Sequence, residues 1–267
     1  MQKKVTIKTL RGMKRRSEKI CMLTAYDYLT AKHVDAAGVD AILVGDSAAM
    51  VFAGYENTLP ITLDEMLYHV KAVNRGRKRA LLVGDMPFLS YQVSQDQAIY
   101  NAGRMLKEGG AEAVKLEGGE PIAPFIDRMT RVGIPVMGHL GMTPQSVHQF
   151  GGYKLQAKCE RSAERLLNDA AALEQAGCFA IVLEKVPYPL AGKVSEKLKI
   201  PTIGIGAGPD CDGQVLVVDD MLGIFEEFDP KFLKRYANLA TIIRQAVSTY
   251  VSEVKNQEFP TLDHSYS

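Results

Sequence analysis

Ionisable side chains recur directly after short apolar runs, at the points where a strand would end and a loop begin. They are Asp46 after ILVG, Asp85 after LLVG, Glu117 after AVKL, His139 after PVMG and Glu184 after AIVL. A single acid in such a place often only caps the following helix or turn. Five such positions in succession favour a shared site, and Lys115, two residues before Glu117, would point to the same side of its strand.

Carboxylates gathered at one site need a counter-charge. Two unit charges about 5 Å apart repel by roughly 3 kcal/mol at an effective dielectric constant of about 20, so either one acid is protonated or a cation lies among them. Hard oxygen donors favour Mg²⁺ or Mn²⁺, although His139 leaves a softer metal open. We therefore predict a metal site at Asp46, Asp85 and Glu117, with Lys115 and Ser47 as donors to an anionic substrate.

Glu184 is the carboxylate that this metal set leaves over. It ends a strongly apolar run, where a poorly hydrated carboxylate suits a general base that works near neutral pH. A hard dication, an ammonium group and a free carboxylate are the parts needed to remove a proton from the carbon next to a ketone. The spacing predicts metal-assisted enolate chemistry on a small 2-oxo acid and leaves the electrophile open.

Eight apolar runs would position these residues. They lie within residues 19–26, 36–47, 79–88, 107–119, 131–141, 174–185, 199–208 and 214–220. Runs such as AIVL and VLVV do not alternate polar with apolar residues, which indicates strands covered on both faces, as in a parallel sheet. Before four of the runs stand Gly38, Gly110, Gly133 and Gly177, where the end of a helix favours a residue that can adopt positive φ.

Amphipathic stretches with helical spacing separate most of these strands. They are residues 64–75, 95–107, 121–131 and 161–175. An open doubly wound sheet shows the same alternation, but eight units in about 250 residues favour a (β/α)8 TIM barrel of the α/β class. We expect one barrel domain over residues 1–267, with a closing helix from Lys231 to Lys255 and a short polar tail.

Composition excludes several other classes of protein. The chain has 267 residues, 46% of them hydrophobic, and 32 basic against 31 acidic side chains give a formal net charge of +1. This balance provides no field to attract nucleic acid or an anionic membrane, and no window has the roughly 18 consecutive apolar residues of a membrane span. Four scattered cysteines and an N-terminus without a signal-peptide pattern predict a reduced, cytoplasmic protein.

At these same residues the sequence resembles the ketopantoate hydroxymethyltransferase family, from about Thr6 to the closing helix. The motifs that carry the resemblance are LTAYDY (23–28), VGDS (44–47), TLPITLDEM (58–66), DMPF (85–88), AVKLEGG (113–119), GHLGMTPQS (138–146), GIGAG (204–208) and CDGQVLV (211–217). The family pattern has other residues at four positions of this chain, which are Ala48, Ala49, Ala157 and Asp219. Alanine in place of a glycine beside Asp46 bears on the geometry of the loop that carries Ser47.

The resemblance implies a (β/α)8 barrel that transfers a hydroxymethyl group from 5,10-methylenetetrahydrofolate to 3-methyl-2-oxobutanoate. The product is 2-dehydropantoate, a precursor of pantothenate and coenzyme A, and the family forms large homo-oligomers. By resemblance, Asp46, Asp85 and Glu117 match the magnesium positions and Glu184 matches the proton acceptor. The keto acid contacts correspond to Asp46, Ser47, Asp85 and Lys115, and His139 is a possible further site residue.

Two other functions remain open from the sequence. GIGAG (204–208) stands where phosphate-binding barrels place a glycine-rich loop, so it indicates either a sugar-phosphate enzyme or an ordinary tight turn. A barrel that has lost catalysis and serves as a scaffold would have no reason to keep four mutually repelling carboxylates. The segment with His148 and Gly151–Gly152 is either a lid over the site or a surface loop.

Overall fold

The structure is a computed structural model that describes residues 3–267 and divides the chain into two compact units. The first unit ends at Val217 and the second extends from Val218 to Ser267. Each unit is described by itself, and the expected single domain over the whole chain stays a prediction.

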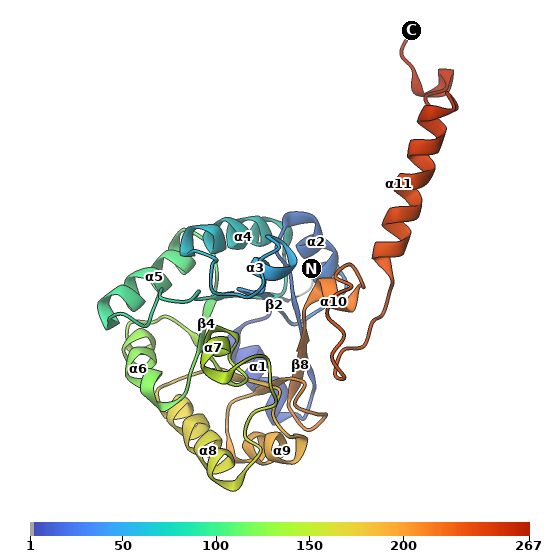
Figure 1. The fold of residues 1–267 in the computed structure, drawn as a ribbon. Helices are drawn as coiled ribbons and strands as arrows, with labels where there is room; N and C mark the ends of the chain where they lie inside the picture. Colours follow the sequence, from blue (N-terminus) through green and yellow to red (C-terminus); the bar gives the residue numbers. More distant parts are fainter. Residues whose placement is uncertain (1–2) are drawn as a thin grey trace. The chain divides into compact units, whose positions relative to one another are not determined.

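The first unit is a closed parallel β-barrel surrounded by helices (Figure 1). Its strands are β1 (Ile20–Thr24), β2 (Ala41–Val44), β3 (Leu81–Asp85), β4 (Ala113–Glu117), β5 (Val136–Gly141), β6 (Ala180–Glu184), β7 (Thr202–Ile205) and β8 (Gly213–Leu216). Seven of them fall within the predicted apolar runs, and β8 begins one residue before the run 214–220. The sheet closes because β1 pairs with both β2 and β8, so the barrel prediction is confirmed and an open doubly wound sheet is excluded.

Helices follow the strands and cover the outside of the barrel. The longer ones are α2 (Tyr28–Ala36), α4 (Leu63–Gly76), α5 (Gln95–Lys107), α6 (Ala123–Arg131), α8 (Glu160–Gln175) and α9 (Tyr188–Lys197). Capping explains where they start: the Thr62 hydroxyl accepts from the N–H of Glu65 while the Glu65 carboxylate accepts from Thr62, which begins α4. The four glycines expected after helices all have φ between 78° and 98°, as predicted.

Shorter elements lie in the connections. The loop after β2 contains α3 (Ala48–Val51), η1 (Glu120–Ile122) precedes α6, and η2 (Pro144–Ser146) and α7 (Val147–Phe150) follow β5. Ala48 and Ala49 form the first turn of α3 in ordinary helical conformation, so this backbone does not require a glycine beside Asp46. Among the described residues, no helix combines the length and apolar character needed to span a bilayer.

The apolar core fills the lower part of the barrel lumen. Alternate residues of the strands point inward, such as Leu81 and Val83 on β3 and Ala180 and Val182 on β6. Leu10 of α1 (Ile7–Arg15), together with other apolar side chains of the N-terminal segment, belongs to the same buried cluster. This packed layer fixes the strands that carry the ionisable residues at their far ends.

The second unit contains α10 (Val218–Met221), α11 (Leu239–Lys255) and η3 (Leu262–His264). The helix expected from Lys231 was wrong in its first part, because residues 231–238 are irregular and α11 begins after Asn238. In that stretch the Arg235 guanidinium donates to the backbone carbonyls of Glu226 and Phe228, which holds the chain in a loop instead of a helix.

Candidate active site

The inward alternation of the strands continues up to their C-terminal ends, where the side chains change from apolar to ionisable. On β3 the inward series is Leu81, Val83 and Asp85, and on β4 it is Ala113, Lys115 and Glu117. His139 on β5 and Glu184 on β6 continue the series of Met137 and Val182. Asp46 enters from the loop after β2. Sequence reasoning therefore placed all six of these residues correctly at one end of the barrel.

Lys115 is the central cation of this group. Its ammonium lies 2.9 Å from Asp85 Oδ1 and 3.1 Å from His139 Nδ1. Asp85 Oδ2 in turn accepts the backbone N–H of Asp46 at 3.0 Å. Since an ammonium only donates, the neutral form of the His139 ring would accept at Nδ1 and carry its proton on Nε2, 3.4 Å from Glu184 Oε2.

Burial makes this charge density costly. The side chains of Asp85, Lys115, Glu117 and His139 are between 3% and 4% exposed. Burial, followed by the carboxylates of Glu117 and Asp85, raises the pKa of Asp46 well above its ordinary value. Burial alone would lower the pKa of Lys115, but its three carboxylate neighbours outweigh burial and raise it, so Lys115 stays charged.

His139 lies between opposing influences. Burial and the Lys115 ammonium disfavour the imidazolium, whereas Glu117 and Glu184 favour it and raise the pKa of His139 to about 9. Nδ1 is also 3.4 Å from Glu117 Oε1. Protonated Nδ1 could no longer accept from Lys115 and would instead donate to Glu117 Oε1. Through its two ring nitrogens, His139 connects Glu117 with Glu184.

Glu184 is the most accessible acid of the ring, with its side chain 15% exposed. Its place is fixed by the chain reversal after β5: Met142 donates its N–H to the Glu184 carbonyl at 2.8 Å. Gly141 has a φ of 91°, and a Cβ there would collide with the same carbonyl oxygen. The end of β6 thus holds a carboxylate where a substrate can reach it.

Gln145 is the functional candidate that sequence reasoning missed. Its amide donates to Asp46 Oδ2 at 3.0 Å and to the Met86 carbonyl at 2.9 Å, and its backbone N–H donates to Glu117 Oε2 at 2.9 Å. The Tyr91 hydroxyl donates to Gln145 Oε1 at 3.0 Å. Both residues lie in loops, so no strand periodicity marks them, although Gln145 is part of the motif GHLGMTPQS.

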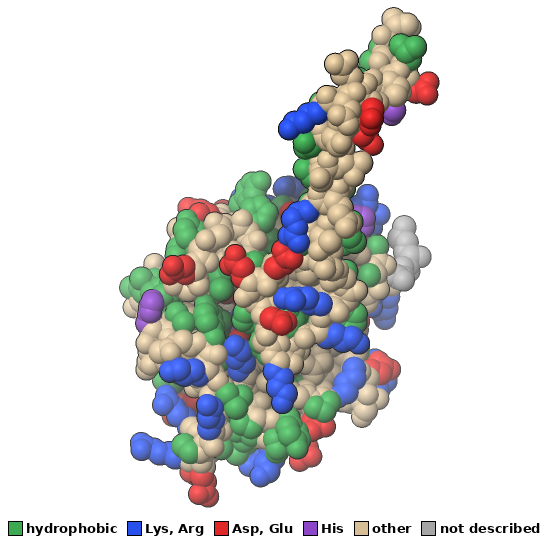
Figure 2. Space-filling view, turned by 45° about the vertical axis from the view of Figure 1, so that its right-hand side comes forward, with side chains coloured by type: hydrophobic (Ala, Val, Ile, Leu, Met, Phe, Trp, Pro, Cys, Tyr) green, Lys and Arg blue, Asp and Glu red, His purple; other side chains and the backbone are tan. Residues whose placement is uncertain are grey.

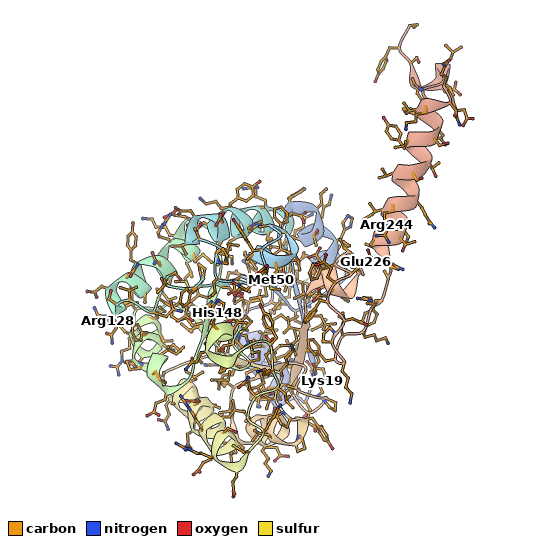
Figure 3. All side chains as sticks on the ribbon, viewed as in Figure 1. Lys19, Met50, Arg128, His148, Glu226 and Arg244 are labelled. Atoms are coloured by element: carbon orange, nitrogen blue, oxygen red, sulfur yellow. The ribbon has the colours of Figure 1, made fainter. Side chains whose placement is uncertain are left out.

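Other predicted positions divide between the site and the surface. Ser47 directly follows Asp46, and its hydroxyl is 2.8 Å from the Tyr26 hydroxyl. His148 on α7 is exposed. In Figure 3, His148 and Met50 lie near the centre of the ring of helices, whereas Arg128 lies at its outer edge. Ala157 adopts a φ of 54°, in the left-handed region that favours glycine. Asp219 belongs to the second unit.

The cluster fits a hard divalent cation by its donor chemistry. The carboxylates of Asp46, Asp85 and Glu117 lie around the Lys115 ammonium, and Glu184 adds a fourth beside His139, so the acids outnumber Lys115 and His139 together. The buried Glu117 Oε1 accepts no hydrogen bond from the described residues. No three His, Cys, Asp or Glu side chains of residues 3–267 stand in a ready-made ligand arrangement. Mg²⁺ commonly uses only one or two carboxylates and completes its shell with water and substrate oxygens.

A closed parallel barrel with a buried acidic cluster at the C-terminal ends of its strands defines a (β/α)8-barrel with an enzyme-type site. The model of the ketopantoate hydroxymethyltransferase family matches residues 4–262. This chain belongs to the ketopantoate hydroxymethyltransferase family.

Two relatives of this family have high sequence identity to the chain. The chain is 60% identical over 267 residues to a 3-methyl-2-oxobutanoate hydroxymethyltransferase of Trichlorobacter lovleyi, with all of both chains covered. It is 58% identical over 264 residues to the enzyme of the same name from Syntrophus aciditrophicus, which covers 99% of this chain and 97% of the relative.

Solved structures of lower identity share the fold. A phosphonopyruvate hydrolase in complex with oxalate and Mg²⁺ matches with a TM-score of 0.63 at 13% identity, over 98% of this chain and 92% of the other. A 2,3-dimethylmalate lyase of the PEP mutase/isocitrate lyase superfamily matches with a TM-score of 0.61 at 17% identity, over 98% and 91%. These likenesses show the barrel architecture.

The hydrogen bonds of Gln145 generate a stability prediction. Gln145→Leu keeps the approximate volume but leaves Asp46 Oδ2 and the Met86 carbonyl without their amide donor. We expect the free energy of unfolding in urea to fall by about 2–4 kcal/mol, since each unpaired buried group costs about 1–3 kcal/mol. Gln149→Leu, on the exposed part of the same segment, is the control, and an equal effect of the two substitutions would contradict this role.

Proposed function

We infer that this chain is a 3-methyl-2-oxobutanoate hydroxymethyltransferase, which forms ketopantoate (2-dehydropantoate) for pantothenate biosynthesis with 5,10-methylenetetrahydrofolate as one-carbon donor. Family membership supports the reaction. The observation that supports its location is the convergence of Asp46, Asp85, Lys115, Glu117, His139 and Glu184 at one mouth. The competing phosphate site has weaker support: GIGAG folds as the end of β7 and a turn, with positive φ at Gly206 and Gly208.

The keto acid binds through its carboxylate and ketone oxygens at the rim of β2 to β4. Lys115 Nζ, held charged by its neighbours, and Ser47 Oγ are the donors to these oxygens. Asp46, Asp85 and Glu117 would hold Mg²⁺, which when bound supplies Lewis-acid stabilisation to the negative charge that develops on the ketone oxygen. The surrounding burial keeps water out and strengthens these interactions.

Glu184 removes the proton from C3 of 3-methyl-2-oxobutanoate. The electron pair of the broken C3–H bond forms the enolate. One water hydrolyses the two C–N bonds of the methylene bridge, its two protons go to the folate nitrogens, and tetrahydrofolate leaves behind a one-carbon unit at the oxidation level of formaldehyde. The enolate carbon adds to this unit, and the new alkoxide takes the proton that Glu184 removed. His139 Nε2, 3.4 Å from Glu184 Oε2, orients the base and is a positioning residue for it.

A reducing, cytoplasmic location belongs to this proposal. All four cysteines, Cys21, Cys159, Cys178 and Cys211, are free thiols. Figure 2 shows basic and acidic side chains mixed over the visible face of the first unit, which supports small-molecule substrates instead of nucleic acid or a membrane as partners.

The role of Glu184 predicts a specific loss in proton exchange. With Mg²⁺ and no folate, Glu184→Gln should lower the exchange of the C3 proton of 3-methyl-2-oxobutanoate for deuterium, followed by NMR, by about 10² to 10⁴, the usual contribution of a general base. Glu196→Gln, at an exposed position of α9, is the matched control and should exchange normally. Full exchange by Glu184→Gln would assign the base to another group.

The metal assignment predicts weaker cation binding after loss of one carboxylate charge. Asp46→Asn should raise the dissociation constant for Mn²⁺, measured from the EPR signal of the free ion, by about tenfold or more, because hard cations bind through charged oxygens. Asp64→Asn, on the exposed surface of α4, is the control. Unchanged Mn²⁺ affinity in Asp46→Asn would remove Asp46 from the metal set.

A homo-oligomer is the remaining part of the proposal, and α11 supports it. Ile243, Val247, Tyr250 and Val254 are exposed apolar residues at helical spacing on one stripe of this helix. Light scattering after size exclusion should give a mass that is a multiple of 29.3 kDa, and Val247→Asp should reduce it. Ser248→Asp, on the opposite side of α11, should leave the mass unchanged; a monomeric unmodified chain would contradict the proposal.

A further inference from the structure

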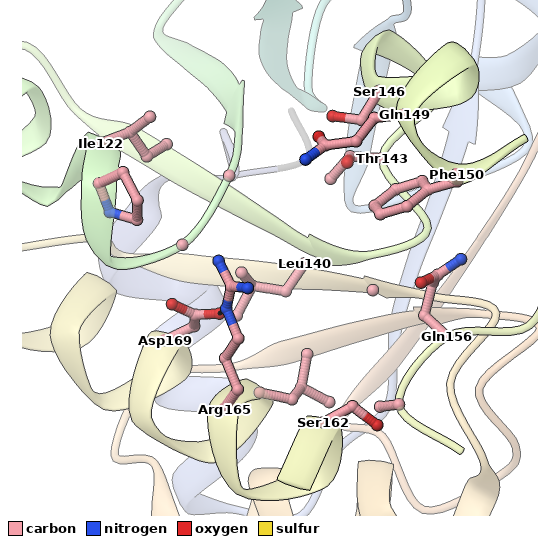
Figure 4. Close-up of a pocket in the computed structure, with 16 residues that line it drawn as sticks. Ile122, Leu140, Thr143, Ser146, Gln149, Phe150, Gln156, Ser162, Arg165 and Asp169 are labelled. Carbon is pink, nitrogen blue, oxygen red and sulfur yellow. Dashed lines mark ion pairs between the residues drawn. The ribbon is translucent and has the colours of Figure 1, made fainter. Parts of the chain in front are cut away.

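A cavity opens at the end of the barrel that carries the acid cluster, outside the ring of strands. Its volume is about 320 Å³, and its walls are the loops after β4 and β5 and the first turns of α8 (Figure 4). Leu140 forms part of the floor and alternates with the inward-pointing His139, so it faces away from the lumen. Leu166 of α8 completes this apolar floor.

The cavity shares its walls with the acid cluster. Gly118 follows Glu117, Leu140 follows His139, and Thr143 and Ser146 stand on either side of Gln145. On the side of β6, Gln156 donates its N–H to the Lys185 carbonyl at 2.9 Å. Because the walls after β4 and β5 directly continue the strands that carry Glu117 and His139, a ligand in the cavity would lie next to the keto acid.

Several polar side chains that face the cavity have no partner in the protein. Thr143, Ser146 and Gln149 lie along one wall, and their side chains form no hydrogen bond with residues 3–267. Ile122 and Phe150 provide apolar surfaces on two further sides, as Figure 4 shows. Flat apolar walls with a few free donors and acceptors on one edge are the features that bind a heteroaromatic ring.

Arg165 extends this lining at the cavity rim. Its side chain is 76% exposed, and its ion pair with Asp169 is long, at 3.8 Å. Asp169 is itself occupied, since its carboxylate accepts the N–H of Glu120 at 2.7 Å. The guanidinium of Arg165 is therefore available to an anionic group that leaves the cavity towards solvent.

We propose that this cavity is the subsite for the bicyclic ring of the one-carbon donor, a reduced folate, with Arg165 binding its carboxylate tail. The inference rests on the proposed function. The lumen itself cannot take this ring, because the side chains around Lys115 are almost fully buried. A volume of about 320 Å³ is at the lower end for ligand pockets, which suits a bicyclic ring whose tail continues outside.

The segment between cavity and mouth is placed to separate the two substrates. Gln156 and Ala157 line the cavity, whereas the Tyr153 hydroxyl reaches across to Met50 Sδ at 3.6 Å. The Tyr153 carbonyl accepts a hydrogen bond from the Lys185 ammonium at 3.2 Å, so the segment is joined both to α3 and to the residue after Glu184. The one-carbon unit would reach C3 of the keto acid beneath this segment.

A fluorescence titration tests the site directly, because the chain contains no tryptophan. In Phe150→Trp the new indole would lie in the cavity wall, and we expect tetrahydrofolate to quench its emission in a saturable manner. Tyr100→Trp, on the exposed face of α5, is the control and should show no saturable quenching. Absence of saturable quenching in a Phe150→Trp enzyme that still transfers the hydroxymethyl group would overturn the proposal.

A charge reversal at the rim provides the second test. Arg165→Glu should raise KM for 5,10-methylenetetrahydrofolate about tenfold, the loss expected for one hydrogen-bonded charge pair. Arg161→Glu, one turn earlier on α8 and outside the cavity lining, should raise this KM less than Arg165→Glu does. An equal effect of both reversals would refute the subsite.

Proton exchange of the keto acid without folate, measured on the same variants, separates this proposal from the proposed function. In Arg165→Glu we expect the rate of hydroxymethyl transfer to fall while the rate of C3 proton exchange stays near that of the unmodified chain. If the unmodified chain neither exchanges the proton nor transfers the group, the proposed function fails as well; if it does both while the two tests above fail, only the subsite is wrong.

Discussion

The structure depends on holding three carboxylates around one buried ammonium, with a fourth, Glu184, beside His139, at the upper end of the barrel lumen. Lys115 makes this possible, since it contacts Asp85 directly and donates to His139, while Gln145 supplies neutral donors to Asp46 and Glu117. Breaking one partner of such a buried set leaves a charge without compensation and costs several kcal/mol. In the proposed function, the remaining excess of negative charge would attract the divalent cation.

A rigid scaffold beneath the cluster makes this arrangement tolerable. The apolar layer of the lower lumen contributes hydrophobic stabilisation without polar groups, and the same strands then present ionisable residues at their ends. The residues that stabilise the barrel and the ionisable residues of the candidate site thus occupy different levels along the barrel axis. Glu184 differs from its neighbours because it lies at the accessible edge, which suits the role of general base proposed for it.

Much of this architecture could be predicted from the sequence because it follows from periodicity. The strands, the glycines after the helices and the six ionisable residues at the strand ends all follow from patterns of two or of three to four residues. Gln145 and Tyr91 escaped such reasoning, since their contacts join loops far apart in the sequence. The late start of α11 depends on local contacts of Arg235, and the cavity beside α8 depends on how three segments pack.

The most direct measurement is the free energy of unfolding in denaturant with Mg²⁺ and with a chelator. A cation that binds only the folded chain stabilises it by RT ln(1 + [L]/Kd), which is about 2.7 kcal/mol at a concentration 100 times Kd. The account predicts that Mg²⁺ stabilises the unmodified chain and that this gain disappears when Asp46 and Asp85 are both changed to asparagine. An equal gain in both proteins, or none in the unmodified chain, would contradict it.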